Sequence, residues 1–318
     1  MKNHFYKYAL GLLSLTFCSC NVASISSISP ALSSVEVTPT PDTMTITAKQ
    51  GNYEPKYEDY LLSTSEKLSY KDYQIERHSK PTIIEGKKYD EDGHQYAILK
   101  RNDKAVTQFD VIVNPLGTDI RFGLHSLLGQ NTKQLIVEQT ANRDWQYWIV
   151  DLNQKAKIIH DSGKYGVGNG LGVFDIDKDG KEELIQSHLA FWFFNKLNNA
   201  NSPFPEIVFA YDSKSKEYIP ANNYFQDFVL RDIQQHISKV KEAKFKSDVA
   251  KNDGDILGAM LDVMLRYIYA GKEKDAWEFY EAEYNLSDKA DMKSKIKNKL
   301  KEDLVYQNIS KWSKKTSK

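Results

Sequence analysis

A short acidic segment, residues 175–184 (DIDKDGKEEL), holds the side chains best suited to binding a metal ion. Its expected ligands are oxygen donors spaced along one loop: Asp175, Asp177, Asp179, Glu183 and the backbone carbonyl of Lys181. Gly180 permits the tight turn that lets these oxygens converge. Calcium fits best, because it accepts about six to eight oxygens in loose geometry, whereas magnesium requires a stricter octahedron. The segment predicts one calcium ion (Ca2+) with a structural role; an acidic, solvated turn is the alternative.

The residues on either side of this loop favour strands and disfavour the helices of an EF-hand. An EF-hand needs a bidentate glutamate at about loop position twelve, where this chain has Gln186. The pairs VF before the loop and LI after it are typical of strands. The segment instead resembles the DxDxDGxxE/D-L loop of FG-GAP and VCBS repeats, the calcium-binding strand-loop-strand units of integrin-type β-propellers. That resemblance covers residues 175–184 and implies the ligands named above.

A β-propeller should show internal repeats, and the chain contains a weak one. Aligning residues 182–185 with residues 133–136 places the acidic positions of the loop on residues without a carboxylate, so a second unit would have lost its ion site. These residues are Ser126, Leu128 and Gln130. Residues 56–221 hold about three or four such units, fewer than the roughly four to eight blades that close a propeller. A divergent or incomplete propeller and a stack of β-meanders both stay open.

Residues 56–221 as a whole favour antiparallel β structure. Short runs rich in β-branched and aromatic residues, such as FDVIVN (109–114) and QLIVEQT (134–140), alternate with turns of Gly, Asn and Asp. One hairpin is expected around the Asp-Gly turn of residues 90–93. With the helical pattern that follows, the sequence predicts an α+β, multi-domain protein: a β-rich domain over 56–221 and an α-helical domain over 222–318.

The C-terminal part carries apolar residues at helical spacing. Helices are expected over residues 224–247, 256–270, 274–284 and 288–309. Gly271 is expected to end the second helix, and Ser287 to cap the last one. Small and aromatic residues near this hairpin resemble the central part of a tetratricopeptide repeat: Tyr267, Gly271, Ala276 and Tyr280. A plain helical hairpin is the alternative, because close packing of two helices selects the same residues.

The N-terminus has the pattern of an export signal. Lys2 and Lys7 flank the start of an apolar run, residues 8–17, which is shorter than the roughly 20 residues that span a bilayer. The run ends in FCSC (17–20), which resembles the lipobox of bacterial lipoproteins. The phenylalanine stands where that family has an aliphatic residue. An ordinary cleaved leader with two incidental cysteines is the alternative.

The lipobox resemblance implies a signal peptide over 1–19, cleavage before Cys20 and acylation of that cysteine, which would anchor the protein to a membrane. Asn21 stands where an inner-membrane lipoprotein has Asp, which implies the outer membrane or the cell surface. Residues 20–55 are rich in Ser, Thr and Pro and predict a flexible tether. Both cysteines of the chain lie in residues 18–20, so the exported body is expected to rely on packing and an ion, without a disulfide.

The sequence contains no recognisable catalytic constellation. Lys plus Arg and Asp plus Glu both number 43, so no net charge attracts nucleic acid. The 7 histidines form no HExxH motif, and there is no GxSxG elbow or P-loop. The sequence favours a non-enzymatic, lipid-anchored envelope or surface protein that binds a protein or glycan ligand or serves as a scaffold. The alternative is a calcium-dependent hydrolase, with His188 as a base near the metal.

Overall fold

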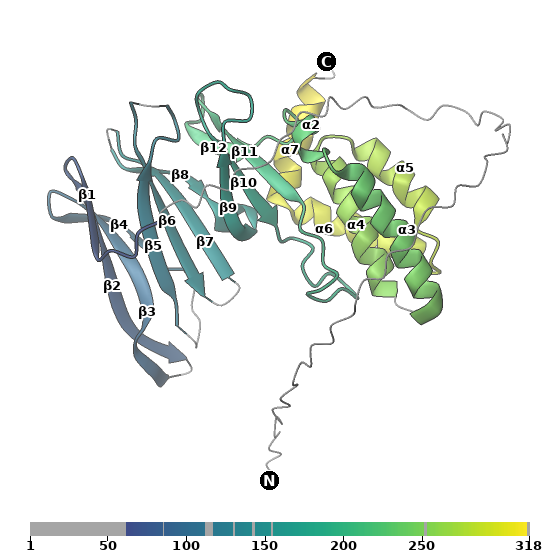
Figure 1. Ribbon diagram of the computed structural model, residues 1–318, viewed down its shortest axis with the longest axis horizontal. Helices are drawn as coiled ribbons and strands as arrows, with labels where there is room; N and C mark the ends of the chain where they lie inside the picture. Colours follow the sequence, from purple (N-terminus) through teal and green to yellow (C-terminus); the bar gives the residue numbers. More distant parts are fainter. Residues whose placement is uncertain are drawn as a thin grey trace, which may run out of the picture. The chain divides into compact units, whose positions relative to one another are not determined.

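Three four-stranded antiparallel sheets and a helical region make up the described part of the chain (Figure 1). The computed structural model describes residues 62–316 except 85, 112–116, 130, 142–143, 154 and 251–252. The prediction of antiparallel sheets followed by helices is confirmed, and none of these sheets closes on itself. The predicted signal peptide, Cys20 and the tether of residues 20–55 lie outside the described residues.

Each sheet is an up-and-down meander, because its strands are neighbours in chain order. The first sheet contains β1 (Lys67–Tyr70), β2 (Tyr73–Ile84), β3 (Lys87–Arg101) and β4 (Lys104–Phe109). The second contains β5 (Asp119–His125), β6 (Gln134–Ala141), β7 (Asp144–Asp151) and β8 (Lys157–Asp161). The third contains β9 (Val167–Phe174), β10 (Glu183–His188), β11 (Glu206–Asp212) and β12 (Glu217–Pro220). Short turns therefore suffice for most connections inside a sheet.

The hairpin expected around residues 90–93 is wrong. β3 runs through these residues, and the turn between β2 and β3 contains Gly86, whose φ is 77°. β2 and β3 pair from Tyr73↔Arg101 to Ile84↔Lys87, with register shifts on either side of Thr82. A glycine with positive φ provides the left-handed backbone that a tight turn needs. The shifts let the two long strands stay paired up to that glycine.

The second sheet is buried on both faces, which explains why its central strands are apolar at nearly every position. In β6, Leu135 and Val137 share a core cluster with Ile75 of the first sheet. The intervening Ile136 belongs to the cluster that contains Phe209 of the third sheet. Successive residues of a strand point to opposite faces of the sheet. A strand that is covered on both faces therefore needs apolar residues at every position, not only at alternate ones. The second sheet therefore lies between the other two.

The helices pack against the third sheet and around one central helix. They are α1 (Ser162–Tyr165), α2 (Gln226–Val229), α3 (Ile233–Ala250), α4 (Asp253–Tyr269), α5 (Glu273–Glu283), α6 (Lys289–Glu302) and α7 (Leu304–Thr316). α4 contacts α3, α5 and α7, and its Met260, Leu261 and Met264 are fully buried. A helix that is apolar nearly all round is stable only when it is enclosed in this way. Among the helices of the described residues, none has the length and apolar character needed to cross a membrane.

The chain leaves α4 as the sequence predicts, through Gly271. The φ of Gly271 is 78°, and the amide of Lys272 donates to the carbonyl of Tyr267 over 2.8 Å. A left-handed glycine with such a backward hydrogen bond is the usual C-terminal cap of a helix.

Two of the expected helices are divided in the structure. The segment 224–247 forms α2 and α3, and the segment 288–309 is split between α6 and α7 at Asp303. Asp303 has an extended backbone with ψ 117°, and its Oδ1 accepts the amide of Val305 over 2.9 Å, which caps α7. The cap predicted at Ser287 is wrong, because Asp288 occupies the N-cap position of α6 and its side chain makes no capping hydrogen bond.

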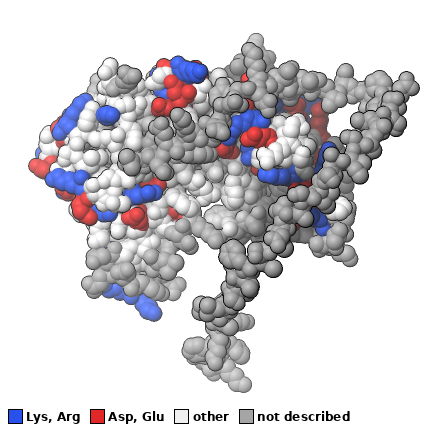
Figure 2. All heavy atoms as spheres, in the orientation of Figure 1, with Lys and Arg blue, Asp and Glu red and all other residues white. Residues whose placement is uncertain are grey.

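Acidic and basic side chains are interspersed over the first sheet on the face shown in Figure 2. Lys100 pairs with Glu76, and Nζ of Lys80 lies 2.6 Å from Oδ2 of Asp110. Partly exposed ion pairs of this kind contribute about 0–1 kcal/mol each. The stability of the first sheet therefore rests on its apolar inner face.

His160 in β8 makes the interface between the second and third sheets sensitive to pH. Its ring is 3% exposed, and its centroid lies 4.7 Å from that of Phe209. Burial lowers the pKa of His160 from 6.5 to about 4. Below pH 6.5 the unfolded chain therefore binds a proton that the folded chain does not bind until about pH 4. The contribution of His160 to stability is complete above pH 6.5 and is lost as the pH falls toward 4.

We expect the wild type to lose about 1–3 kcal/mol more unfolding free energy than His160→Phe between pH 7 and 4.5. Phenylalanine keeps the aromatic contacts but cannot titrate, so the difference between the two proteins isolates this ring. Urea unfolding at each pH measures it. The same pH dependence in both proteins would show that His160 is not buried in its neutral form.

Candidate metal centre

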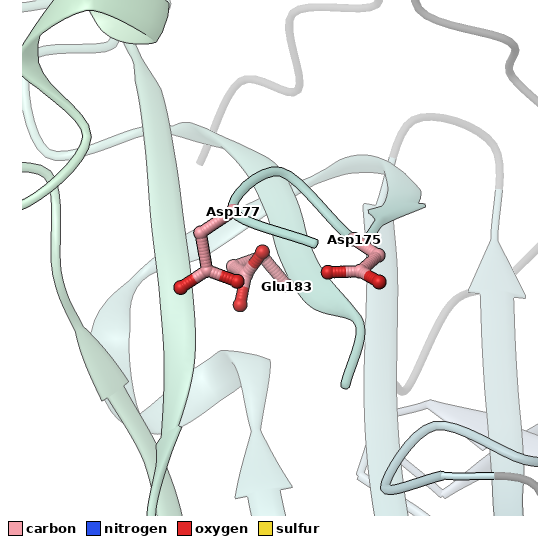
Figure 3. A group of neighbouring side chains, drawn as sticks. All are labelled: Asp175, Asp177 and Glu183. Carbon is pink, nitrogen blue, oxygen red and sulfur yellow. The ribbon is translucent and has the colours of Figure 1, made fainter. Parts of the chain in front are cut away.

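Asp175, Asp177 and Glu183 come together in the loop that joins β9 to β10 (Figure 3). One carboxylate oxygen of each residue lies within 4.8 Å of the other two. Glu183 is the first residue of β10 and pairs with Phe174, the last residue of β9. The antiparallel register therefore brings the two ends of the loop side by side, and with them its first and last carboxylates.

Backbone amides of the loop hold the two aspartates in place. The amide of Gly180 donates to Oδ2 of Asp175 over 3.0 Å, and the amide of Asp179 donates to Oδ1 of Asp177 over 3.1 Å. The backbone is left-handed at Lys178 (φ 63°) and at Gly180 (φ 84°). These two residues let the loop curl, as the glycine in the sequence predicts.

Glu183 is the buried member of the cluster, with 3% of its surface exposed. Its Oε2 accepts the amide of Ile176 over 2.8 Å. Burial, together with the charges of Asp177, Asp179 and Asp175, nevertheless raises the pKa of Glu183 to about 7. Oδ1 of Asp175 is also buried and has no hydrogen-bond partner in the described part of the chain. A hard cation would relieve this repulsion and supply the missing partner, so the three carboxylates fit calcium chemically.

One of the five predicted ligands, Asp179, lies differently. The carboxylate of Asp179 is outside the cluster of three: it lies 2.6 Å from Nζ of Lys181 and accepts the Lys181 amide over 2.8 Å. This contact with Lys181 holds the pKa of Asp179 below its ordinary value. The lysine side chain thus neutralises the third aspartate, which the spacing of the motif does not reveal.

The loop is tied to the second sheet and to the far strand of its own sheet. The amide of Glu182 donates to the carbonyl of Leu127 over 2.8 Å, and the Tyr218 hydroxyl donates to the carbonyl of Glu182 over 3.0 Å. Leu127 lies between β5 and β6, the place in the second sheet that corresponds to the acidic loop in the third. The alignment of residues 133–136 with 182–185 indicated this correspondence, but not the contact between the two loops.

Ser126 and Leu128, which the alignment places at acidic positions, also lie between β5 and β6; Gln130 is outside the described residues. Neither side chain offers a carboxylate, so this loop lacks the ligands of its counterpart.

His188 lies at the opposite end of β10 from Glu183 and belongs to a separate polar group. It is 1% exposed; its Nδ1 lies 3.1 Å from the Tyr269 hydroxyl and its Nε2 lies 3.2 Å from Oδ1 of Asp303. A ring whose two nitrogens face buried protein groups is placed for structure, not for proton transfer to a ligand at the acidic loop.

Comparison of this chain with models of protein families, with curated proteins and with solved structures found no match.

Proposed function

We propose that the chain is an exported lipoprotein, anchored through acylated Cys20 at the outer membrane or cell surface. Its β-rich part would hold one structural calcium ion, and the protein would act as a non-enzymatic binding or scaffold module for a protein or glycan ligand. The observation that carries the ion site is the convergence of Asp175, Asp177 and Glu183 within 4.8 Å of one another. The lipobox-like segment FCSC (17–20) supports the anchor.

We further propose that the three sheets are propeller-like blades related to FG-GAP or VCBS units. The acidic loop joins the first two strands of a four-stranded meander, and the corresponding loop of the preceding meander contacts it. Repeated units that stack neighbour on neighbour bury a continuous core in this way. Three sheets are fewer than the roughly four to eight blades of a closed propeller, so the proposed arrangement is an open stack.

The calcium site predicts a large thermal shift. Calcium at about 100 times its dissociation constant should stabilise the folded chain by about 2.7 kcal/mol, a rise in Tm of roughly 5–10 °C. Asp177→Ala should abolish the rise in Tm. It removes one of the three converging carboxylates, and the two that are left are too few to bind the calcium ion. Differential scanning fluorimetry of the purified chain, with and without calcium, measures both effects.

Asp212→Ala is the matched control. Asp212 is also an aspartate in a turn, where its oxygens accept the amides of Lys214 and Ser215, but it is not in the cluster. This variant should lower the Tm with and without calcium and keep the increment. An unchanged wild-type Tm at millimolar calcium would leave the loop as a solvated acidic turn.

The lipid anchor is tested separately. Mass spectrometry of the mature N-terminus should find Cys20 as the first residue, carrying acyl chains, because durable attachment requires more than one chain. Cys20→Ser should release the protein from the membrane fraction. An unmodified Cys20 in the mature protein would contradict the anchor and leave the calcium site unaffected.

A further inference from the structure

A cavity of about 290 Å³ lies between the second and third sheets. Its wall is formed by residues of β5, β6 and β7 on one side and of β9, β10 and β11 on the other. This volume is just below the roughly 300–1,000 Å³ that small-molecule sites occupy. The cavity is therefore large enough for one small molecule of one or two rings.

Glu138 provides a fixed, charge-compensated acceptor in the wall. It is 3% exposed, and its Oε1 accepts a hydrogen bond from Nε of Arg121 over 2.6 Å, with a second from the same guanidinium. Its Oε2 accepts the Tyr147 hydroxyl over 2.6 Å. Burial raises the pKa of Tyr147, so this hydroxyl stays protonated and donates. A carboxylate has about four acceptor positions, and three donors leave one of them for a ligand.

Gln186 provides a buried polar atom without a partner. It is 2% exposed and lines the cavity, and its Oε1 lies 2.7 Å from Nε2 of neutral His160. Its amide nitrogen has no hydrogen-bond partner in the described residues. Exchanging the amide oxygen and nitrogen, with the other histidine tautomer, only moves the unsatisfied atom from nitrogen to oxygen. A buried amide group left in this state costs about 1–3 kcal/mol, which a ligand in the cavity would recover.

The charges of the wall are balanced in pairs. Arg121 binds Glu138, and Oε2 of Glu206 lies 2.8 Å from Nη2 of Arg231. A charged ligand would find no uncompensated partner among these groups and would have to be desolvated at a cost. A neutral ligand with hydroxyl groups avoids that cost and can still use the acceptors and donors.

The remaining wall is apolar and open. Ile136 and Leu171 contribute aliphatic surface. Gly170 has φ 98°, and a Cβ atom there would meet nothing within 4 Å, so this stretch of β9 leaves room beside its backbone. Aliphatic surface next to fixed hydrogen-bonding groups matches a sugar ring, which has apolar faces and a rim of hydroxyls.

We propose that this cavity binds a neutral, polyhydroxylated small molecule of the mono- or disaccharide class, held by the Gln186 amide and the Glu138 carboxylate. The inference rests on the proposed binding role, for which it names the ligand class, and is independent of the calcium site.

Isothermal titration calorimetry of the full chain tests this with D-glucose, D-galactose, N-acetyl-D-glucosamine and maltose, and with charged D-glucuronate and glucosamine 6-phosphate. At least one neutral sugar should bind saturably, and Gln186→Met should weaken the affinity for that sugar about tenfold or more. Gln134→Met is the matched control, since Gln134 is also buried with an unpartnered amide nitrogen but does not line the cavity. It should change the affinity by less than about twofold.

Binding of charged sugars alone, binding of none of the sugars, or unchanged affinity in Gln186→Met would each overturn the inference. If Gln186→Met does not fold, a crystal structure of the wild type soaked in the tightest neutral sugar decides: density in the cavity supports the inference, and density elsewhere refutes it. The calcium-induced Tm shift is measured on the same samples. A normal calcium shift without sugar binding refutes only this inference, whereas sugar binding without a calcium shift refutes only the ion site.

Discussion

Replacing Asp303 with alanine should lower the free energy of unfolding by about 3–5 kcal/mol, because it leaves the buried groups that contact this carboxylate, His188 and the Tyr269 hydroxyl, without that partner. Asp303 is 6% exposed and His188 is 1% exposed, and their closest atoms are 3.2 Å apart. Burial alone would raise the pKa of Asp303, but His188 and the Tyr269 hydroxyl, 2.6 Å away, outweigh it and hold that pKa below its ordinary value. The carboxylate is therefore ionised in the folded protein and joins β10, α4 and α7.

Urea unfolding followed by circular dichroism measures this loss as a lower midpoint at constant slope. Asp291→Ala is the control: Asp291 pairs with Lys295 on the exposed side of α6, where its side chain is 62% exposed. Asp291→Ala should lower the free energy of unfolding by less than about 1 kcal/mol. Asp303→Asn, which keeps the shape and an acceptor for the Val305 amide, should fall between the two. Equal, small losses for Asp303→Ala and Asp291→Ala would contradict a buried ionic group.

Gly258→Ala should destabilise the protein by at least about 2 kcal/mol through overpacking. A Cβ atom at Gly258 in α4 would lie 2.0 Å from the backbone oxygen of Asn201. Asn201 lies in the long connection between β10 and β11, and its side-chain amide also donates to Asp255 of α4 over 3.0 Å. Helix propensity alone predicts the opposite sign, a gain of up to about 1 kcal/mol when alanine replaces glycine.

Whether Gly258→Ala lowers or raises the stability therefore distinguishes overpacking from helix propensity. Thermal unfolding is sufficient to measure this. Ser294→Ala, at an exposed position of α6, is the control in which propensity acts without a close neighbour. It should be neutral or slightly stabilising. A stabilised Gly258→Ala would mean that the β10–β11 connection does not rest on α4.

The sequence was most informative where local chemistry decides the structure. The acidic loop curls at Gly180, and α4 is followed by Gly271 in the left-handed conformation, because a positive φ strongly favours glycine. The runs of β6 and β7 are rich in β-branched and aromatic residues, which favour strands. Each of these features depends on residues that are close together in the chain.

Features that depend on distant residues could not be predicted in this way. Asp303, which separates α6 from α7, contacts His188 and Tyr269, and both of these residues are far away in the sequence. The cavity beside Gln186 requires two sheets to face each other, and no single segment encodes that.

The burial of the second sheet on both faces also sets the order in which the chain can open. Separating the first sheet exposes only the single apolar face that includes Ile75 and Leu99. Opening the second sheet exposes two interfaces at once, so the amide hydrogens of Ile136 and Ile149 can exchange with solvent only when the neighbouring sheets also come apart. The middle sheet is thus expected to exchange its amide hydrogens more slowly than the first sheet, which can open at a single interface.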